Sequence, residues 1–340
     1  MIRWGVIGAG GFADRRAIPG LKKARNARLQ AVMVRDLERA RALARKHGAP
    51  EAYDRVEALL ESPNVDAVYL CTPVDLHRVH TEAAAAAGKH VFCEKPMAMS
   101  VEDCQAMIRA CEGAGVQLGI AYMMRYRPQC QVAKELIGEG RLGELVAGRA
   151  QNAFWYPEVP GAWRQDPARG KGGVLADVGS HCVDTLRFLM GEVVEVQGLT
   201  ASAHFAYPVE DTAVALLRFA NQALGMVDCS FAVPHRECPL ELYGTRGAIL
   251  VARALGPFPN PEMRLLDEAG EHQIPLPQVD AYTAEFEAMS QAIMDGRPHE
   301  VDGWEGLRIT EILLAILRSA ERGEPVPIRS RREGVGPEAG

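Results

Sequence analysis

Short apolar runs alternate with longer helical segments from residue 2 to about residue 120, and this alternation leaves few folds open. The runs are rich in β-branched and aromatic residues, whereas the segments between them are rich in Ala, Leu, Glu and Arg. The runs read IRWGVIG, RLQAVMV, DAVYLCT, HVFCE and VQLGIAY. Because strands that alternate with helices pair in parallel through right-handed crossovers, we expect an α/β fold with a doubly wound parallel sheet.

The pattern changes after about residue 122, where strand-like stretches follow one another with few helices between them. Successive strands of this kind predict an α+β unit with a large, mainly antiparallel sheet. One helical insert, LADVGSHCVDTLRFLMG, interrupts the strands, and the closing segment RREGVGPEAG has the composition of a disordered tail. Since single cores stop growing at roughly 250–300 residues, we expect two domains, 1–122 and 123–340. The expected strands span 145–155, 193–204, 212–219, 223–232, 238–243 and 248–252, and the closing helices 280–296 and 304–322.

Charge and hydropathy exclude several classes of protein. The formal net charge of −6 argues against nucleic-acid binding, which usually needs a basic excess. The sequence shows neither a secretory signal nor an apolar stretch of bilayer-spanning length, so we expect a cytoplasmic protein. The eight cysteines form no CxxC pair, which favours reduced, packed thiols over disulfide bonds.

The first predicted strand leads into the glycine-rich segment GAGGFA, which spans Gly8 to Ala13 and includes Gly11 and Phe12. Gly8, Gly10 and Ala13 fill a G-x-G-x-x-A pattern: Gly8 permits a tight turn, Gly10 admits a pyrophosphate, and Ala13 allows close helix packing. A glycine-rich turn alone is common and can be a plain tight turn. Its position between a strand and a helix favours dinucleotide binding.

The end of the second predicted strand bears on the choice of cofactor. An acidic residue there usually binds the adenosine ribose of NAD, but Val34 occupies the position. The next residue, Arg35, suits a 2′-phosphate, whereas Asp36 could serve NAD after a small shift in register. We therefore favour NADP(H) over NAD(H).

These motifs together resemble the Gfo/Idh/MocA oxidoreductase family over residues 2 to about 328. The resemblance rests on GVIGAGGFA, CTPVDLH, AGKHVFCEKPMAMS, GRLGEL, WRQDPARGKGGVLADVGSHCVDTLRFLMG and SAERGEPV. It implies a Rossmann domain, and a C-terminal domain whose open sheet often forms the subunit interface. It also implies NAD(P)-dependent chemistry on sugars, cyclic polyols or related molecules, and a homodimer or homotetramer assembled through that sheet.

The EKP motif places Lys95 at the carboxyl edge of the predicted parallel sheet, where ligands bind. By itself Lys95 could be a solvated surface residue. The resemblance implies that it lies beside the nicotinamide, where a cation stabilises the alkoxide-like charge of hydride transfer. It also implies that Thr72, Pro73, His77 and Glu94 contact the cofactor. His77 and His80 share a predicted helix, but no zinc-type motif accompanies them, so we expect no metal.

The stretch DVGSHCVD contains Asp177, His181 and Asp184, and the first two stand at i and i+4 of a predicted helix. Such a pair is often a surface pair. The resemblance identifies His181 as the proton acceptor or donor, suited by its near-neutral pKa, and Asp177 as the residue that orients it or holds a substrate hydroxyl.

The resemblance further places Arg125, Trp163 and Arg164 in the substrate pocket, although Arg125 could equally cap a helix. Arginine and aromatic rings suit a hydroxyl-rich ligand. We therefore expect an NAD(P)-dependent oxidoreductase acting on a secondary alcohol or carbonyl. Two alternatives remain open: a glycoside hydrolase of the same fold that retains its NAD, and a non-catalytic NADP sensor.

Overall fold

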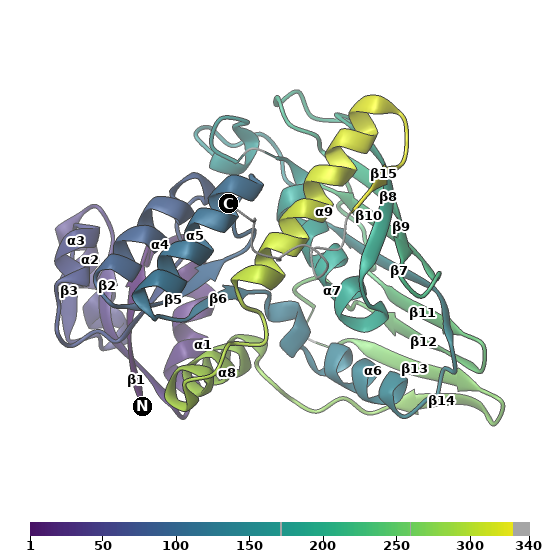
Figure 1. Ribbon diagram of the computed structural model, residues 1–340, viewed down its shortest axis with the longest axis horizontal. Coiled ribbons are helices and arrows are strands. Elements are labelled where there is room, and N and C mark those ends of the chain that lie inside the picture. Colours follow the sequence, from purple (N-terminus) through teal and green to yellow (C-terminus); the bar gives the residue numbers. More distant parts are fainter. Residues whose placement is uncertain (171, 259, 329–340) are drawn as a thin grey trace, which may run out of the picture.

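The computed structural model describes residues 1–170, 172–258 and 260–328, which form two β-sheets flanked by helices (Figure 1). The first sheet has six strands, all paired in parallel, in the order β3-β2-β1-β4-β5-β6. This confirms the predicted doubly wound sheet. Only the short edge strand β3 was not predicted. The strands are β1 (Ile2–Ile7), β2 (Ala27–Met33), β3 (Glu51–Tyr53), β4 (Ala67–Leu70), β5 (His90–Glu94) and β6 (Leu118–Ala121).

Helices connect these strands, and several have clear end signals. Asp36 caps α2 (Leu37–His47) by accepting a hydrogen bond from the Arg39 amide at 2.8 Å, and Ser100 caps α5 (Val101–Ala114) in the same way. Gly48 ends α2 in the left-handed conformation that glycine adopts at little cost. The helical segments are η1 (Ala13–Ala17), α1 (Ile18–Lys23), α2 (Leu37–His47), α3 (Val56–Leu60), η2 (Val74–Leu76), α4 (His77–Ala86) and α5 (Val101–Ala114).

The strand order reverses around β1, which lies between β2 and β4. In open α/β sheets, ligands bind at the carboxyl ends of the strands beside such a reversal. The segments that leave β1 and β4 are in close contact there: a Cβ atom on Gly8 would lie 2.4 Å from the Cys71 carbonyl oxygen. Only glycine therefore fits at this turn.

The second sheet has nine strands in the order β14-β13-β12-β11-β7-β10-β9-β8-β15. The β7–β10 pair is parallel and the other pairs are antiparallel, which confirms the mainly antiparallel prediction. Strands β13 to β15 were not predicted. The strands are β7 (Leu145–Ala153), β8 (Val193–Ala201), β9 (Thr212–Phe219), β10 (Leu224–Ser230), β11 (Leu240–Gly244), β12 (Gly247–Ala252), β13 (Glu262–Asp267), β14 (Gly270–Ile274) and β15 (Val326–Pro327).

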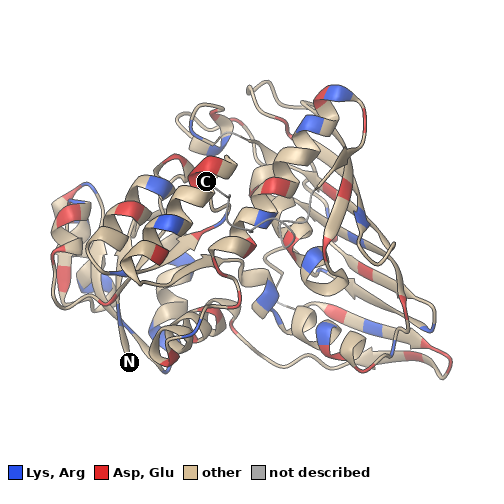
Figure 2. Ribbon diagram, in the orientation of Figure 1, with Lys and Arg blue, Asp and Glu red and all other residues tan. Residues whose placement is uncertain are grey.

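Helices α7 and α9 pack on one face of this second sheet. Its other face carries exposed apolar side chains, among them Leu199, Leu216 and Leu224. Acidic and basic residues are interspersed over both halves of the molecule (Figure 2), as is usual for a solvated surface. The remaining helical segments are η3 (Met123–Tyr126), α6 (Pro128–Gly138), η4 (Trp163–Gln165), η5 (Leu175–Gly179), α7 (Ser180–Met190), α8 (Ala281–Asp295) and α9 (Gly303–Arg322).

Helix α8 comes late in the chain but packs on the first sheet (Figure 1). The Trp4 indole donates a hydrogen bond to the Ser290 hydroxyl at 3.0 Å, and Phe286 packs edge-on against Trp4 and Tyr69. The predicted division into domains 1–122 and 123–340 stays a prediction, because α8 belongs to the second range but packs on the sheet of the first. Among the described residues, no helix is both long and apolar enough to cross a membrane. The tail RREGVGPEAG lies outside the described residues.

Candidate active site

One cavity of about 1560 Å³ extends along the carboxyl edge of the first sheet and reaches the second sheet. Pockets for drug-sized ligands measure roughly 300–1,000 Å³, so this cavity can hold a dinucleotide together with a small substrate. It is lined by these predicted site residues: Gly8, Gly10, Gly11, Phe12, Arg35, Thr72, Pro73, Glu94, Lys95, Trp163, Arg164, Asp177 and His181.

The glycine loop fits the anionic part of a dinucleotide. Gly8 and Gly11 have positive φ angles of 84° and 53°, so the backbone can turn tightly without a side chain in the way. A Cβ atom on Gly10 would lie 2.9 Å from an Arg39 guanidinium nitrogen. Ala13 is fully buried at the start of η1 and packs in the core below the loop, as close helix packing requires, so it does not itself line the cavity.

Two exposed arginines, Arg35 and Arg39, line the cavity beside the end of β2. Neither has an ion-pair partner in the part of the chain that the structure describes, so both are available to a phosphate. Asp36, the alternative ribose ligand, also lines the cavity, but its Oδ1 atom is occupied in capping α2. Arg39 was not predicted from the sequence, although its place in the first turn after the strand was a usable signal.

At the other end of the cavity, Lys95 and Arg164 both contact Asp177. Lys95 Nζ donates to the Asp177 backbone oxygen at 2.6 Å and to Oδ1 at 3.0 Å, and Arg164 Nε lies 3.2 Å from the same Oδ1. The Lys95 and Asp177 side chains are only 10% and 14% exposed. Burial alone would raise the pKa of Asp177, but Arg164 and Lys95 hold that pKa well below its ordinary value. The carboxylate therefore stays ionised and fixes both cations.

Glu94 and the bond after Lys95 complete this group. The Tyr69 hydroxyl donates to the Glu94 carboxylate, which also accepts from the Lys95 amide at 3.1 Å. Burial raises the pKa of Glu94, although the Tyr69 hydrogen bond and the Lys95 charge lower it. The peptide bond between Lys95 and Pro96 is cis, a point that the sequence left open.

His181 differs from the sequence-based expectation in two ways. A π-helical turn, η5, contains Asp177 and ends at Gly179, whereas His181 is the second residue of α7, so the two residues do not share one α-helix. Burial and the nearby charge of Lys95 lower the pKa of His181 well below 6.5, rather than leaving it near neutrality. The imidazole is thus neutral at pH 7. Its ring stands perpendicular to that of Tyr122 at 6.4 Å, and Nδ1 is buried without a hydrogen-bond partner among the described residues.

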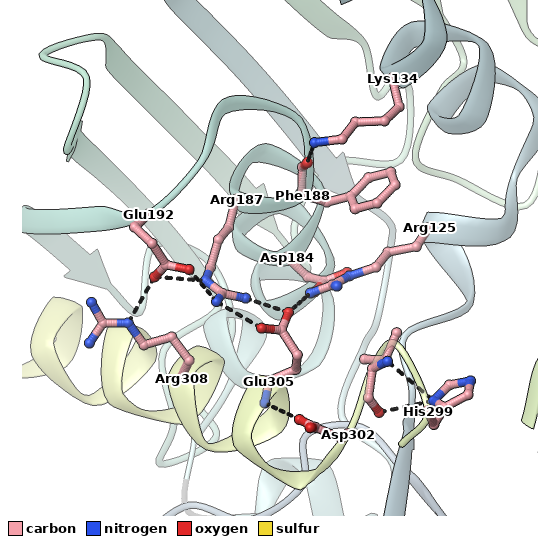
Figure 3. Close-up of polar contacts among 11 residues, drawn as sticks. Arg125, Lys134, Asp184, Arg187, Phe188, Glu192, His299, Asp302, Glu305 and Arg308 are labelled. Carbon is pink, nitrogen blue, oxygen red and sulfur yellow. Dashed lines mark hydrogen bonds and ion pairs between the residues drawn. The ribbon is translucent and has the colours of Figure 1, made fainter. Parts of the chain in front are cut away.

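Arg125 lies outside the cavity, contrary to the prediction that it contacts substrate. The Arg125 side chain is buried and belongs to an ion-pair network (Figure 3). Arg125 Nη2 lies 2.6 Å from Asp184 Oδ1 and 2.8 Å from Glu305 Oε2, and Arg187 contacts Glu305 at 2.7 Å. Burial would raise the pKa of Glu305, but Arg187 and Arg125 lower it to about 2. The network joins η3, α7 and α9 next to the site.

His77 also lies outside the cavity, contrary to the prediction of cofactor contact. Its buried ring places Nε2 2.9 Å from the Thr72 oxygen, and Nδ1 3.1 Å from the Pro96 oxygen and 3.2 Å from the Met97 oxygen. It joins the segment after β4 to the segment that carries Lys95. Its contribution to the site is therefore structural.

Comparisons with known proteins agree with this fold. Residues 2–122 match the family model described as "Oxidoreductase family, NAD-binding Rossmann fold", and residues 130–250 match "GFO/IDH/MocA C-terminal domain". The chain is 32% identical to the 1,5-anhydro-D-fructose reductase of Ensifer adhaerens, over 97% of this chain and 99% of that protein. It is 30% identical to a D-xylose 1-dehydrogenase (NADP(+)) of Haloferax volcanii, over 96% and 99% of the two chains.

A solved structure shares the whole fold. The aldose-aldose oxidoreductase of Caulobacter crescentus, crystallised with glycerol, superposes with a TM-score of 0.90. The two sequences are 30% identical, and the match covers 96% of this chain and 99% of that one.

Proposed function

This chain belongs to the Gfo/Idh/MocA family of oxidoreductases, and we propose that it transfers hydride between NADP(H) and a secondary alcohol or carbonyl of a sugar-like substrate. It is an NAD(P)-dependent oxidoreductase that acts on sugars or polyols. The observation that supports the specific reaction is the group of Lys95, Arg164 and Asp177 at the carboxyl end of β5, inside a cavity large enough for both ligands. The test is a screen of sugars and polyols with both cofactors, followed at the nicotinamide absorbance.

A nicotinamide held in this cavity would supply or accept the hydride. Lys95, held by the ionised Asp177, donates a hydrogen bond to the reacting oxygen and stabilises the negative charge that develops there. In the oxidation direction the neutral His181 accepts the hydroxyl proton, and in reduction it returns a proton to the same oxygen. Trp163 and Arg164, which stack at 4.4 Å, cover the substrate.

His181→Asn should reduce turnover by roughly 10²–10⁴-fold, the usual contribution of a general acid or base. Because burial lowers the pKa of His181, the neutral base is present above that pKa and is lost as the pH falls through it. The wild-type oxidation rate should therefore show an acid limb below pH 6.5, and His181→Asn should abolish it. Thr185→Val, one helical turn further along α7, serves as the control and should keep the limb. Identical pH–rate profiles for wild type and His181→Asn would show that another group moves the proton.

We propose NADP(H) as the preferred cofactor because Arg35 and Arg39 offer two forks to a 2′-phosphate. Val34→Asp should place a carboxylate beside that phosphate and shift relative affinity towards NAD by about ten- to a hundredfold, since one charge-assisted contact is worth roughly 1.5–3 kcal/mol. Arg39→Ala should weaken NADP binding and leave NAD binding nearly unchanged.

Calorimetric titration of both cofactors provides the measurement for these variants. Arg41→Ala is a matched control, because Arg41 lies on the same helix but pairs with Glu38 at 2.6 Å. Tighter binding of NAD than of NADP by the wild type would contradict the assignment and indicate Asp36 as the ribose ligand.

We also propose that the open face of the second sheet joins subunits into a homodimer or homotetramer. Leu199 is 71% exposed there, and Leu216 and Leu224 are 53% and 52% exposed, an unusual gathering of large apolar side chains. Leu216→Asp should lower the mass measured by light scattering, whereas Val79→Asp on α4 should not. A monomeric wild type would exclude this interface.

A further inference from the structure

Two arginines that the proposed mechanism does not use, Arg127 and Arg236, line the cavity. Arg127 Nη1 donates to the Ala254 oxygen at 3.2 Å, and Arg236 Nη1 donates to the Pro234 oxygen at 3.1 Å. Arg236 Nε is buried and has no hydrogen-bond partner among the residues that the structure describes. Within residues 1–170, 172–258 and 260–328, no carboxylate forms an ion pair with either guanidinium. Both positive charges are thus uncompensated.

The two arginines lie against the same short segment, residues 254–258. Backbone hydrogen bonds from Arg253 to Glu237 (2.9 Å) and from Ala254 to Cys238 (3.0 Å) place this segment beside the residues that follow Arg236. The Arg236 guanidinium lies 5.8 Å from the centroid of the Phe258 ring, and Arg127 reaches the Ala254 oxygen. Residues 255–258 themselves line the cavity, so this wall presents two cations to any ligand inside it.

This wall belongs to the chemical end of the cavity. Arg127 follows η3, and the ring of Tyr122, just before η3, lies 6.4 Å from the ring of His181. Cys238, whose backbone oxygen accepts from the Ala254 amide, contacts Ala153 at the end of β7, and β7 packs against η5, which carries Asp177. The other arginines at that end are compensated: Arg164 pairs with Asp177, and Arg169 with Asp75. Arg127 and Arg236 therefore differ from Arg164 and Arg169 in having no ion-pair partner among the described residues. Arg15 and Arg16, which also line the cavity without such a partner, belong to η1 after the glycine loop.

An uncompensated, partly buried guanidinium is costly, and burial lowers the pKa of Arg127. A ligand that brings a negative charge removes this cost. Planar guanidinium groups bind carboxylates and phosphates in a two-pronged geometry that neutral hydroxyls cannot match.

We propose that the substrate carries an anionic group, a carboxylate or a phosphate, which Arg127 and Arg236 bind on the wall formed by residues 254–258. The proposal rests on the proposed function and narrows its substrate class to sugar acids or sugar phosphates. Oxidation or reduction takes place at a ring or chain carbon near Lys95, while the anionic group stays at the two arginines and does not react.

The test measures binding to the NADP-loaded protein by calorimetry, so it does not depend on turnover. The ligands are D-glucose, D-glucuronate and D-glucose 6-phosphate, which share one ring and differ in the charge at the terminal carbon. At least one of the two anions should bind roughly tenfold or more tightly than D-glucose. The better anion distinguishes a carboxylate site from a phosphate site.

Arg127→Gln and Arg236→Gln should each reduce this preference, and the double variant should abolish it while D-glucose binding stays unchanged. Arg253→Gln is the matched control, since Arg253 lies next to the same segment but outside the cavity and 3.6 Å from Glu237. Thermal melting verifies that each variant is folded.

Two results would overturn the proposal. One is a wild-type protein that binds D-glucose as tightly as it binds each of the two anions. The other is a preference that survives in the double variant while NADP affinity falls, because the arginines would then serve the cofactor pyrophosphate. The sugar and polyol screen reports separately on hydride transfer, so a failure of the proposed function is distinguishable from a failure of this anion site.

Discussion

Replacing Lys95 with methionine is expected to lower turnover by about 10²–10³-fold while the affinity for cofactor changes little. Loss of one donor to a developing oxyanion typically costs roughly 2.7–4 kcal/mol in the transition state. Lys95 is suited to this role because Asp177 fixes its ammonium group through two contacts, at 2.6 and 3.0 Å. Methionine keeps the length and apolar stem of the side chain but has no hydrogen to donate.

Steady-state kinetics with the best substrate from the screen, together with calorimetric titration of cofactor, check this prediction. Lys89→Met is the matched control: Lys89 precedes β5 at its opposite end, and its Nζ donates to the Ser62 and Val65 oxygens at 2.9 and 2.8 Å. The control should retain wild-type turnover. An active Lys95→Met enzyme would remove Lys95 from the chemistry and leave Asp177 and Arg164 without a catalytic partner.

Asp184→Ala should lower the free energy of unfolding by about 3–5 kcal/mol, because removal of one partner leaves a buried charge uncompensated. Asp184 is fully buried and accepts hydrogen bonds from Arg125 at 2.6 and 2.9 Å (Figure 3). Arg125 would keep its contact with Glu305 at 2.8 Å, but that carboxylate is shared with Arg187.

Equilibrium urea unfolding measures this loss. Asp184→Asn, which preserves volume, should destabilise less and in the same direction, and it provides a second reading if the alanine variant does not fold. Glu82→Ala removes an exposed pair with Arg78 and should cost about 1 kcal/mol or less. If Asp184→Ala costs no more than Glu82→Ala, the network contributes nothing beyond a surface ion pair.

The first sheet and its cofactor loop could be predicted because their signals are local. Each of the five predicted strands of the parallel sheet is a mainly apolar run between turns, and Gly8 fills a turn whose backbone angle few other residues adopt. The edge strand Glu51–Tyr53 was missed because three partly buried residues carry no recognisable period. Strands β13 and β14 were missed for a related reason: they are short, and their pairing with each other and with β12 defines them.

The candidate site was predictable only in part. The sequence indicated Lys95, Asp177 and His181 as candidate reactive residues. The π-helical turn before α7 and the burial that lowers the pKa of His181 come from packing. Arg125 illustrates the limit best. Arg125 and Arg127 are only two positions apart in the sequence. Nothing in that spacing indicates that the Arg125 side chain reaches Glu305, 180 residues away, while the Arg127 side chain faces the cavity.

By itself, the sequence determined most of the strands and helices in their order and the glycine turn, because backbone preferences act between neighbours a few residues apart. The reactive groups that it indicates stay a prediction. The tertiary structure decided which side chains face the cavity. His77 turns inward to the carbonyl oxygen of Thr72 and to those of the segment after β5, and Arg125 turns inward to carboxylates of α7 and α9. Arg127 and Arg236 instead face the cavity without a carboxylate partner among the described residues. That outcome depends on the cost of burying each polar group and on the partners that folding brings within reach, and these partners lie far apart along the chain.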